Sequence, residues 1–170
     1  MEAEARRIGL KKSTFRNPTG LSHPEHLMTA RELTLLARYI IKEYPEYYKT
    51  FSQREFQYRK HKFYNRNPLL REELGVDGLK TGHTKEAGYG MVVSSITEGR
   101  RLIGVIAGLS TEKERRSETQ RMLEWGAKSV SRAKLFKAGE AVGYARVWGG
   151  TDFYVPLGGE GDLEVILPKY

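Results

Sequence analysis

Apolar residues recur at intervals of three and four in two stretches of the chain, and this spacing predicts two amphipathic helices. The first helix begins after Thr29, because Thr29 and Glu32 form a capping box. It ends near Glu43, since Pro45 cannot continue the helix through the next turn. Its apolar stripe consists of Leu33, Leu36, Ala37, Ile40 and Ile41. We expect this stripe to belong to the core and not to a site.

The second helix is predicted after Thr111, where glutamates gather near the helix start and interact favourably with the helix dipole. One side of it carries Met122, Leu123, Ala127 and Val130. We expect this side to cover a sheet. A shorter helix is predicted at the start of the chain, with Gly9 as its C-terminal stop.

Between the two long helices, the pattern of apolar and polar residues predicts β-structure. Residues 76–84, 89–97 and 101–109 are expected to be consecutive strands, and Glu98-Gly99-Arg100 is a tight connection between the last two. Links this short make neighbouring strands antiparallel. Residues 51–64 alternate aromatic and polar side chains, which suggests two further short strands.

The pattern changes again near residue 137. Beyond it, short β-like stretches at 142–148, 153–157 and 163–167 are separated by glycine-rich turns. About 34 residues of hairpins cannot easily bury a core of their own. We therefore predict one domain over residues 1–136, followed by the truncated start of a small β-rich domain over residues 137–170.

Composition limits the classes of function. The chain has no cysteine, which excludes disulfides, zinc–thiolate sites and thiol catalysis. No stretch approaches the roughly 18 apolar residues of a membrane span. The net charge of +8 could attract an anionic polymer, but the basic residues are scattered. The aromatic residues near them alternate as in a hairpin, so we do not expect a nucleic-acid partner.

The clearest chemical signal is the run Asp77-Gly78-Leu79-Lys80-Thr81-Gly82-His83-Thr84 on the first of the three strands. A strand edge can pair with an extended peptide, and glycine at position 82 lets the peptide backbone approach. A lysine and a hydroxyl beside it can hold a carboxylate by hydrogen bonds. Taken alone, however, a Lys-Thr-Gly triplet is also compatible with ordinary turn chemistry.

The run, with Ala87-Gly88-Tyr89 after it, resembles the low-molecular-mass penicillin-binding proteins that act as D-alanyl-D-alanine carboxypeptidases. The similarity extends over nearly the whole chain. It includes Phe15, Asn17, Gly20-Leu21, Thr29-Ala30-Arg31, Asn65-Arg66-Asn67, Leu69-Leu70, Gly108, Arg115 and Trp125-Gly126. The resemblance implies a mixed α/β fold: part of a β-lactamase/transpeptidase-like domain, with an antiparallel sheet flanked by helices.

The resemblance also implies a reaction and residue roles. In the family, a serine attacks the peptide carbonyl before the terminal D-alanine, D-alanine leaves as an acyl-enzyme forms, and water then releases the shortened stem peptide. By position, Lys80 and Thr81 are similar to the pair that faces the substrate carboxylate, and the His83 N–H to a donor of the oxyanion hole. Arg115 is similar to an arginine that holds the terminal carboxylate. The implied substrate-binding residues are Lys80, Thr81, Gly82, His83, Thr84 and Arg115.

The family also implies partners and a location. The partners are peptidoglycan stem peptides ending in D-Ala-D-Ala, with β-lactams as inhibitors. No cofactor or metal is implied. Family members work at the outer face of the cytoplasmic membrane, often through a C-terminal anchor. The chain shows neither an export signal nor such an anchor, so we expect any signal to lie upstream of Met1.

The chain departs from the family where the nucleophile should be. No Ser-x-x-Lys precedes the triplet and no Ser-x-Asn occurs. Two matches follow it, Ser110–Lys113 after the third strand and Ser131–Lys134 late in the predicted covering helix, and we reject both as nucleophiles. We expect a carboxypeptidase fragment that is inactive alone and unstable or associating when isolated. The alternative is a module that binds peptidoglycan peptides or β-lactams without turnover.

Other polar residues give weaker signals. His23 and His26 are three positions apart, but they lie in a loop with a proline and lack a third ligand at the usual spacing, so we expect no metal site. His61 is expected in a hairpin. Asp77 precedes a glycine, which suggests a turn at the entry to the strand.

Overall fold

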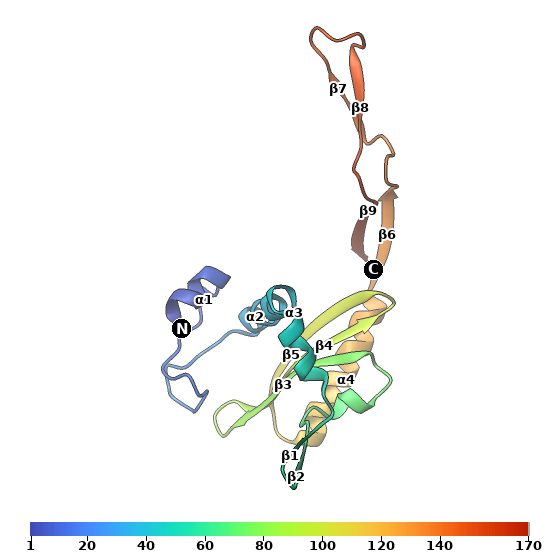
Figure 1. Cartoon of the computed structure of the whole chain (residues 1–170). Helices are drawn as coiled ribbons and strands as arrows, with labels where there is room; N and C mark the ends of the chain where they lie inside the picture. The colour runs from blue at the N-terminus through green and yellow to red at the C-terminus, as the bar shows by residue number, and fades with distance from the viewer. Residues whose placement is uncertain (170) are drawn as a thin grey trace. The chain divides into compact units, whose positions relative to one another are not determined.

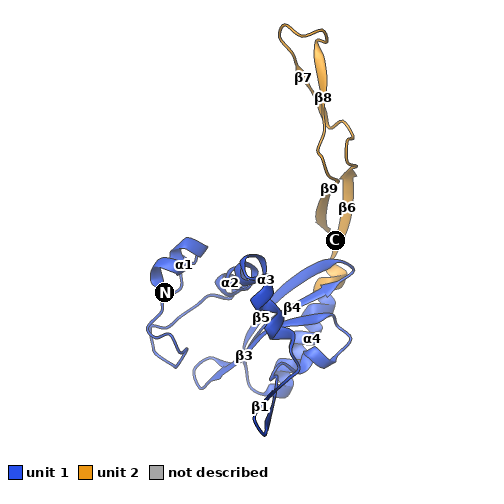
Figure 2. Ribbon diagram, viewed as in Figure 1, with its two compact units in different colours: residues 1–125 blue, residues 126–170 orange. Residues whose placement is uncertain are grey.

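A computed structural model describes residues 1–169 of the chain. The chain divides into two compact units, Met1–Trp125 and Gly126–Tyr170 (Figure 2). The predicted boundary near residue 137 lies within the second of these units and, as a division of functional domains, stays a prediction.

The first unit contains most of the secondary structure (Figure 1). Its helices are α1 (Glu2–Ile8), α2 (Ala30–Glu43), α3 (Pro45–Tyr48) and most of α4 (Glu112–Ser129), with 3-10 helices at Lys49–Ser52 and Pro68–Arg71. Its strands are β1 (Glu55–Tyr58), β2 (His61–Tyr64), β3 (Val76–Thr84), β4 (Gly88–Thr97) and β5 (Arg100–Leu109). The mixed α/β class predicted from the sequence is confirmed.

Strands β3, β4 and β5 form a three-stranded antiparallel sheet in that order, as the sequence predicts. The β4–β5 connection is a two-residue turn in which Glu98 and Gly99 have φ of 51° and 72°. Positive φ at both central residues matches the twist of the flanking strands, so this turn holds the two strands in register. The predicted short strands β1 and β2 form a separate hairpin, and His61 lies in it.

Each face of the sheet packs against a helix. On β4, Met91 and Val93 are buried against Leu123 of α4. Val92, between them, packs in a different cluster with Ala37 of α2. Successive side chains of a strand point to opposite faces, so α2 and α4 lie on the two sides of the sheet. The covering role predicted for α4 is confirmed.

The predicted helix ends are also present. The Thr29 hydroxyl accepts the N–H of Glu32 at the start of α2, whereas the Glu32 carboxylate accepts from Lys12 N and Ser13 Oγ and does not complete the predicted capping box. Gly9 ends α1 with φ 95°, a conformation that glycine adopts without strain. After α2, Pro45 begins the short helix α3, because proline is tolerated at the first helical position, where its missing N–H is not needed.

The second unit contains β6 (Val130–Phe136), β7 (Gly143–Arg146), β8 (Tyr154–Leu157) and β9 (Leu163–Pro168). β6 pairs with β9, and β7 pairs with β8, both antiparallel. Strand β6 differs from the sequence prediction, in which the covering helix continues through Val130 and includes Ser131–Lys134. The helix ends at Ser129 because the next residues pair with a strand far ahead in the chain.

Several large apolar side chains of this unit are exposed, among them Tyr144, Trp148, Phe153 and Tyr154. Among residues 1–169, no helix combines the length and apolar character that crossing a membrane requires.

Candidate functional site

The Lys-Thr-Gly run lies on β3, at the edge of the sheet. Thr81, Gly82, His83 and Thr84 pair with β4 on one side, and no described strand pairs with the other side of β3. A Cβ atom built on Gly82 would meet nothing within 4 Å. The backbone groups of an edge strand can pair with an extended peptide, and the space at Gly82 lets that peptide come close.

Lys80 and Thr81 differ in exposure. The Lys80 side chain is exposed, and its Nζ donates a hydrogen bond to the Thr81 carbonyl oxygen at 2.5 Å. Thr81 is only 6% exposed. The ammonium group is thus held over the strand, and no carboxylate of residues 1–169 forms an ion pair with it. A charged donor in that position can bind an anionic group that lies along the edge.

A row of three side chains leads from β3 to α4. The rings of His83 and Tyr89 are paired across β3 and β4, with their centroids 4.0 Å apart. The guanidinium of Arg115 lies over the Tyr89 ring, 5.6 Å from its centroid. The Tyr89 ring therefore links Arg115 to His83 on β3, although the two residues are far apart in sequence.

Arg115 is buried without full compensation of its charge. Its side chain is 5% exposed, and its contact with Glu112 is long, at 3.5 Å. Its Nε has no hydrogen-bond partner among residues 1–169. A buried cation is unfavourable unless it is paired and hydrogen-bonded. This guanidinium therefore has unused capacity to bind an anion.

The position of Arg115 is set by the start of α4. The Thr111 hydroxyl accepts the N–H of Glu114 at 3.1 Å, and the Glu114 carboxylate accepts the N–H of Ser110 at 2.8 Å. This reciprocal arrangement is a form of the capping box. Ser110–Lys113 thus spans a helix cap. Ser131 and Lys134 lie on β6.

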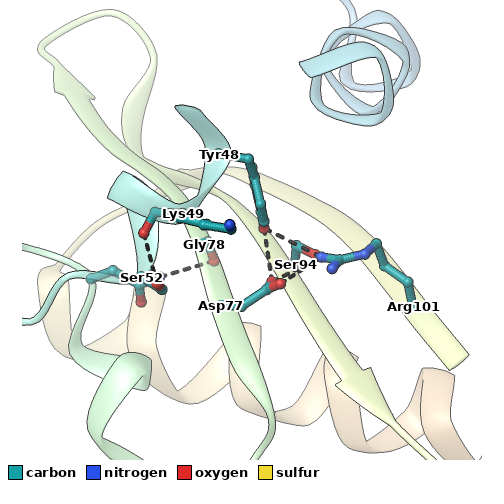
Figure 3. Close-up of polar contacts among 8 residues, drawn as sticks. Tyr48, Lys49, Ser52, Asp77, Gly78, Ser94 and Arg101 are labelled. Carbon is teal, nitrogen blue, oxygen red and sulfur yellow. Dashed lines mark hydrogen bonds and ion pairs between the residues drawn. The ribbon is translucent and has the colours of Figure 1, made fainter. Parts of the chain in front are cut away.

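A polar network holds the beginning of β3 in place (Figure 3). Tyr48 donates its hydroxyl to Asp77 at 2.7 Å, and Arg101 Nη1 lies 2.7 Å from the same carboxylate and 2.6 Å from Ser94 Oγ. Burial, and in addition the Asp77 carboxylate, raise the pKa of Tyr48 to about 12. Asp77 therefore lies inside the strand as a network partner, which the turn predicted from the sequence did not anticipate.

Gly78 packs directly against Tyr48 of this network. A Cβ atom at Gly78 would lie 2.6 Å from the Tyr48 hydroxyl, which is closer than side chains approach each other. Asn67 Nδ2 donates to the Gly78 carbonyl oxygen at 3.1 Å from the other direction. These contacts fix the two residues that precede Leu79 and Lys80. The sequence analysis does not predict these contacts, because Tyr48, Asp77 and Arg101 show no common spacing.

An apolar cavity of about 470 Å³ lies between α2 and the sheet. Leu33, Leu36 and Ile40 line one wall, and the strand from Leu79 to Thr84 lines another. The apolar stripe of α2 is therefore only partly covered. A second cleft, of about 620 Å³, lies beyond Thr84 and is bordered by residues 20–27.

The two histidines considered for a metal do not form a centre. His23 Nδ1 accepts the N–H of Glu25 at 3.1 Å, and His26 Nδ1 accepts the N–H of Arg16 at 3.3 Å. Among residues 1–169, no group of three or more histidine, aspartate or glutamate side chains could hold a metal ion.

Comparison with known proteins identifies the family. The family model described as D-alanyl-D-alanine carboxypeptidase matches residues 1–111. The chain belongs to this family. D-alanyl-D-alanine carboxypeptidase DacA of Haemophilus influenzae is 37% identical, over 99% of this chain and 44% of that protein. The chain thus spans less than half the length of this curated relative.

Solved structures agree with the family and the fold. The crystal structure of penicillin-binding protein 5 from Haemophilus influenzae matches with a TM-score of 0.85 and 37% identity, covering 99% of this chain and 49% of that one. Penicillin-binding protein D2 from Listeria monocytogenes, solved with cefotaxime bound, matches with a TM-score of 0.70 and 32% identity. That match covers 75% of this chain and 53% of that one. The transpeptidase-like architecture predicted from the sequence is confirmed.

Proposed function

We propose that this chain is the substrate-carboxylate-binding part of a serine-type D-alanyl-D-alanine carboxypeptidase. In the parent enzyme it holds a peptidoglycan stem peptide while the terminal D-alanine is removed. The observation that carries the proposal is Arg115, whose buried guanidinium lacks a partner at Nε and lies over the ring of Tyr89, which pairs with the His83 ring of the Lys-Thr-Gly strand. A peptide carboxylate supplies the missing negative charge.

The roles of the strand residues follow from their chemistry. Lys80 and Thr81 directly precede Gly82 and bind the terminal carboxylate together with Arg115. The backbone N–H of His83 donates to the scissile carbonyl oxygen as negative charge develops on it. Gly82 leaves room for the peptide backbone, and Thr84 continues the edge to which the peptide pairs.

The covalent step requires a serine from elsewhere. These 170 residues contain no Ser-x-x-Lys before the triplet and no Ser-x-Asn. In the proposal, a segment outside them carries the serine, whose oxygen attacks the scissile carbonyl and releases D-alanine. Water then hydrolyses the acyl-enzyme. The chain alone is therefore expected to bind the peptide without turning it over.

The proposal extends to inhibitors, location and domains. β-Lactams carry a carboxylate next to a reactive carbonyl, so the same residues bind them. The cognate peptides belong to the cell wall, which places the parent enzyme in the periplasm or cell envelope. Residues 1–136 then form the C-terminal part of the catalytic domain, and residues 137–170 begin the β-rich domain.

The test is a titration of the ¹⁵N-labelled chain with a blocked tripeptide ending in D-Ala-D-Ala. Binding is monitored through the amide chemical shifts of the chain. The same peptide with a C-terminal amide serves as the ligand control, because it lacks only the carboxylate. We expect the acid to shift the signals of His83, Tyr89 and Arg115, and the amide to bind far more weakly.

Arg115→Gln is the matching variant, and Arg116→Gln is its control at the next position, where the arginine is half exposed and paired with Glu72. Loss of a charge-assisted contact is expected to raise the Kd about 10- to 100-fold in Arg115→Gln only. Circular dichroism checks that both variants fold. Equal affinity for acid and amide, or no binding of either, would contradict the proposal.

A further inference from the structure

The hairpin of β1 and β2 leaves large aromatic rings in contact with solvent. Every residue of the two strands is exposed, so neither face of the hairpin is covered by the rest of the unit. Phe56, Tyr58 and Phe63 are 58%, 55% and 55% exposed. Figure 1 shows the hairpin projecting from the unit that carries the three-stranded sheet. Apolar side chains that gather at one exposed place mark a surface that binds a partner.

The strand register places these rings on one face of the hairpin. Phe56 lies opposite Phe63, and Tyr58 lies opposite His61. Directly opposite residues share a face, and so do residues two apart along a strand. The four side chains of these two pairs therefore form one surface, which we call the aromatic face. The other face carries Glu55, Gln57, Lys62 and Tyr64.

Basic side chains accompany the aromatic face. Residues 53–66 contain five basic residues and one acidic residue, so this short segment carries half of the chain's net charge of +8. The one carboxylate, that of Glu55, pairs with Lys62 on the other face at 2.8 Å. Among residues 1–169, no carboxylate forms an ion pair with Arg54, Arg59 or Lys60. Their charges are therefore available to an anionic partner.

The turn of the hairpin consists of two of these cations. Arg59 and Lys60 connect Tyr58 to His61, and Arg59 has φ of 54°. Positive φ in a hairpin turn favours glycine or asparagine, which adopt it at little cost. An arginine in this conformation is unfavourable for the turn itself, which points to a function for its charge. Its guanidinium lies 5.3 Å from the centroid of the Tyr58 ring, so cation and ring reach the same surface.

The arrangement of the rings distinguishes between anionic partners. Nucleobases stack on the flat faces of aromatic side chains, and sugar rings pack on them in a similar way. The His61 and Phe63 rings are inclined by 50° to one another, with centroids 6.4 Å apart, so they form no flat platform. A lipid interface needs none, because each ring enters it separately while basic side chains reach the phosphates. The aromatic face therefore fits a lipid surface better than a nucleic acid or a polysaccharide.

We propose that the aromatic face of the β1–β2 hairpin docks on an anionic lipid surface. Phe56, Tyr58 and Phe63 lie among the headgroups, and Arg59 and Lys60 bind the lipid phosphates. The contact is peripheral, because only one face of a short hairpin takes part. It is independent of the proposed function, since no residue of the carboxylate-binding site belongs to the hairpin.

The test is flotation of the purified chain with vesicles through a sucrose gradient, in which vesicle-bound chain rises and any aggregate sediments. One set of vesicles contains equal parts of phosphatidylglycerol and phosphatidylcholine, and the other contains phosphatidylcholine alone. We expect the chain to float with the anionic vesicles only. Added salt should weaken this binding, because it screens the charge of the headgroups.

The charge of the turn is tested by combining Arg59→Gln with Lys60→Gln. Each basic residue near an anionic surface contributes about fivefold to binding, so the double variant should bind the anionic vesicles about 10- to 30-fold more weakly. Lys11→Gln combined with Lys12→Gln is the control, because it removes the same charge from two adjacent exposed lysines outside the hairpin.

The rings are tested by Phe56→Ser, which should also weaken binding to the anionic vesicles. Tyr47→Ser is its control, because it removes a ring that is 73% exposed but lies on α3. Circular dichroism and the ¹⁵N amide spectrum check that each variant keeps the fold.

Equal flotation with both kinds of vesicle would overturn the proposal, and so would equal losses in the hairpin variants and their controls. Absence of flotation with the anionic vesicles would also overturn it. Retention of the chain on immobilised polygalacturonate would in that case identify an anionic polysaccharide as the partner. The peptide titration that tests the proposed function should be unchanged in the Arg59→Gln and Lys60→Gln double variant, so the two proposals fail separately.

Discussion

The ion pair between Asp77 and Arg101 is expected to stabilise the chain more than an exposed ion pair of similar length. The atoms Arg101 Nη1 and Asp77 Oδ2 are 2.7 Å apart, and the two side chains are 28% and 26% exposed. Lys49 and Glu46 form a pair at 2.8 Å, but these side chains are 71% and 78% exposed. Comparison of the two pairs tests whether partial burial and shared partners strengthen the contact.

The magnitude follows from solvent screening and from the shared partners. Exposed helical pairs contribute about 0.3–0.5 kcal/mol, whereas breaking a fully buried pair costs about 3–5 kcal/mol. For the half-buried Asp77–Arg101 pair we expect a coupling energy of about 1–2 kcal/mol. Asp77→Ala alone should cost about 2–3 kcal/mol, because the buried Tyr48 hydroxyl also loses its acceptor.

The assay is a pair of double-mutant cycles. The free energy of unfolding of each variant is measured by urea unfolding, which is monitored by far-ultraviolet circular dichroism. One cycle uses Asp77→Ala and Arg101→Ala, and the other uses Glu46→Ala and Lys49→Ala. Each cycle reports the coupling between its two side chains. Coupling energies that are equal for the two pairs would refute the reasoning that partial burial strengthens the contact at the start of β3.

Three further predictions concern the unit that carries the site. Gly88→Ala should lower the melting temperature markedly in a thermal scan, since Gly88 has φ 65° and a Cβ would lie 2.7 Å from the Leu109 carbonyl oxygen; an unchanged value would contradict this. Leu123→Ala should cost about 2–5 kcal/mol in urea unfolding, because Leu123 is buried against Met91 and Val93; a cost below about 1 kcal/mol would argue against that packing. Tyr48 keeps its proton in the folded state up to a pKa of about 12, above the value of about 10 in the unfolded chain. Its contribution to stability is therefore present below pH 10 and lost as pH rises from about 10 to 12, and a Tyr48→Phe variant should lack this part of the pH profile of unfolding.

The parts of the fold that the sequence predicted correctly are those whose signals are local. The cap of α2 needs only Thr29 and Glu32, and the β4–β5 turn needs only Glu98 and Gly99. The spacing of Met122 and Leu123 predicts the side of α4 that covers the sheet. Such features depend on neighbours in sequence, so they can be recognised without knowledge of the fold.

The features that were missed depend on distant residues. Val130 continues the helical pattern of α4 by its spacing, but it pairs with Pro168 in the β6–β9 ladder. The Tyr48–Asp77–Arg101 network joins three separate segments. The unpaired Nε of Arg115 likewise requires the tertiary structure.

The most direct test of the account is the intact mass of the purified chain after incubation with excess benzylpenicillin. The chain is proposed to contribute carboxylate-binding residues and no nucleophile, so its mass is expected not to change. A gain of one penicillin would contradict it, because a serine within the chain would then be acylated. Peptide mapping would locate that serine, beginning with Ser110.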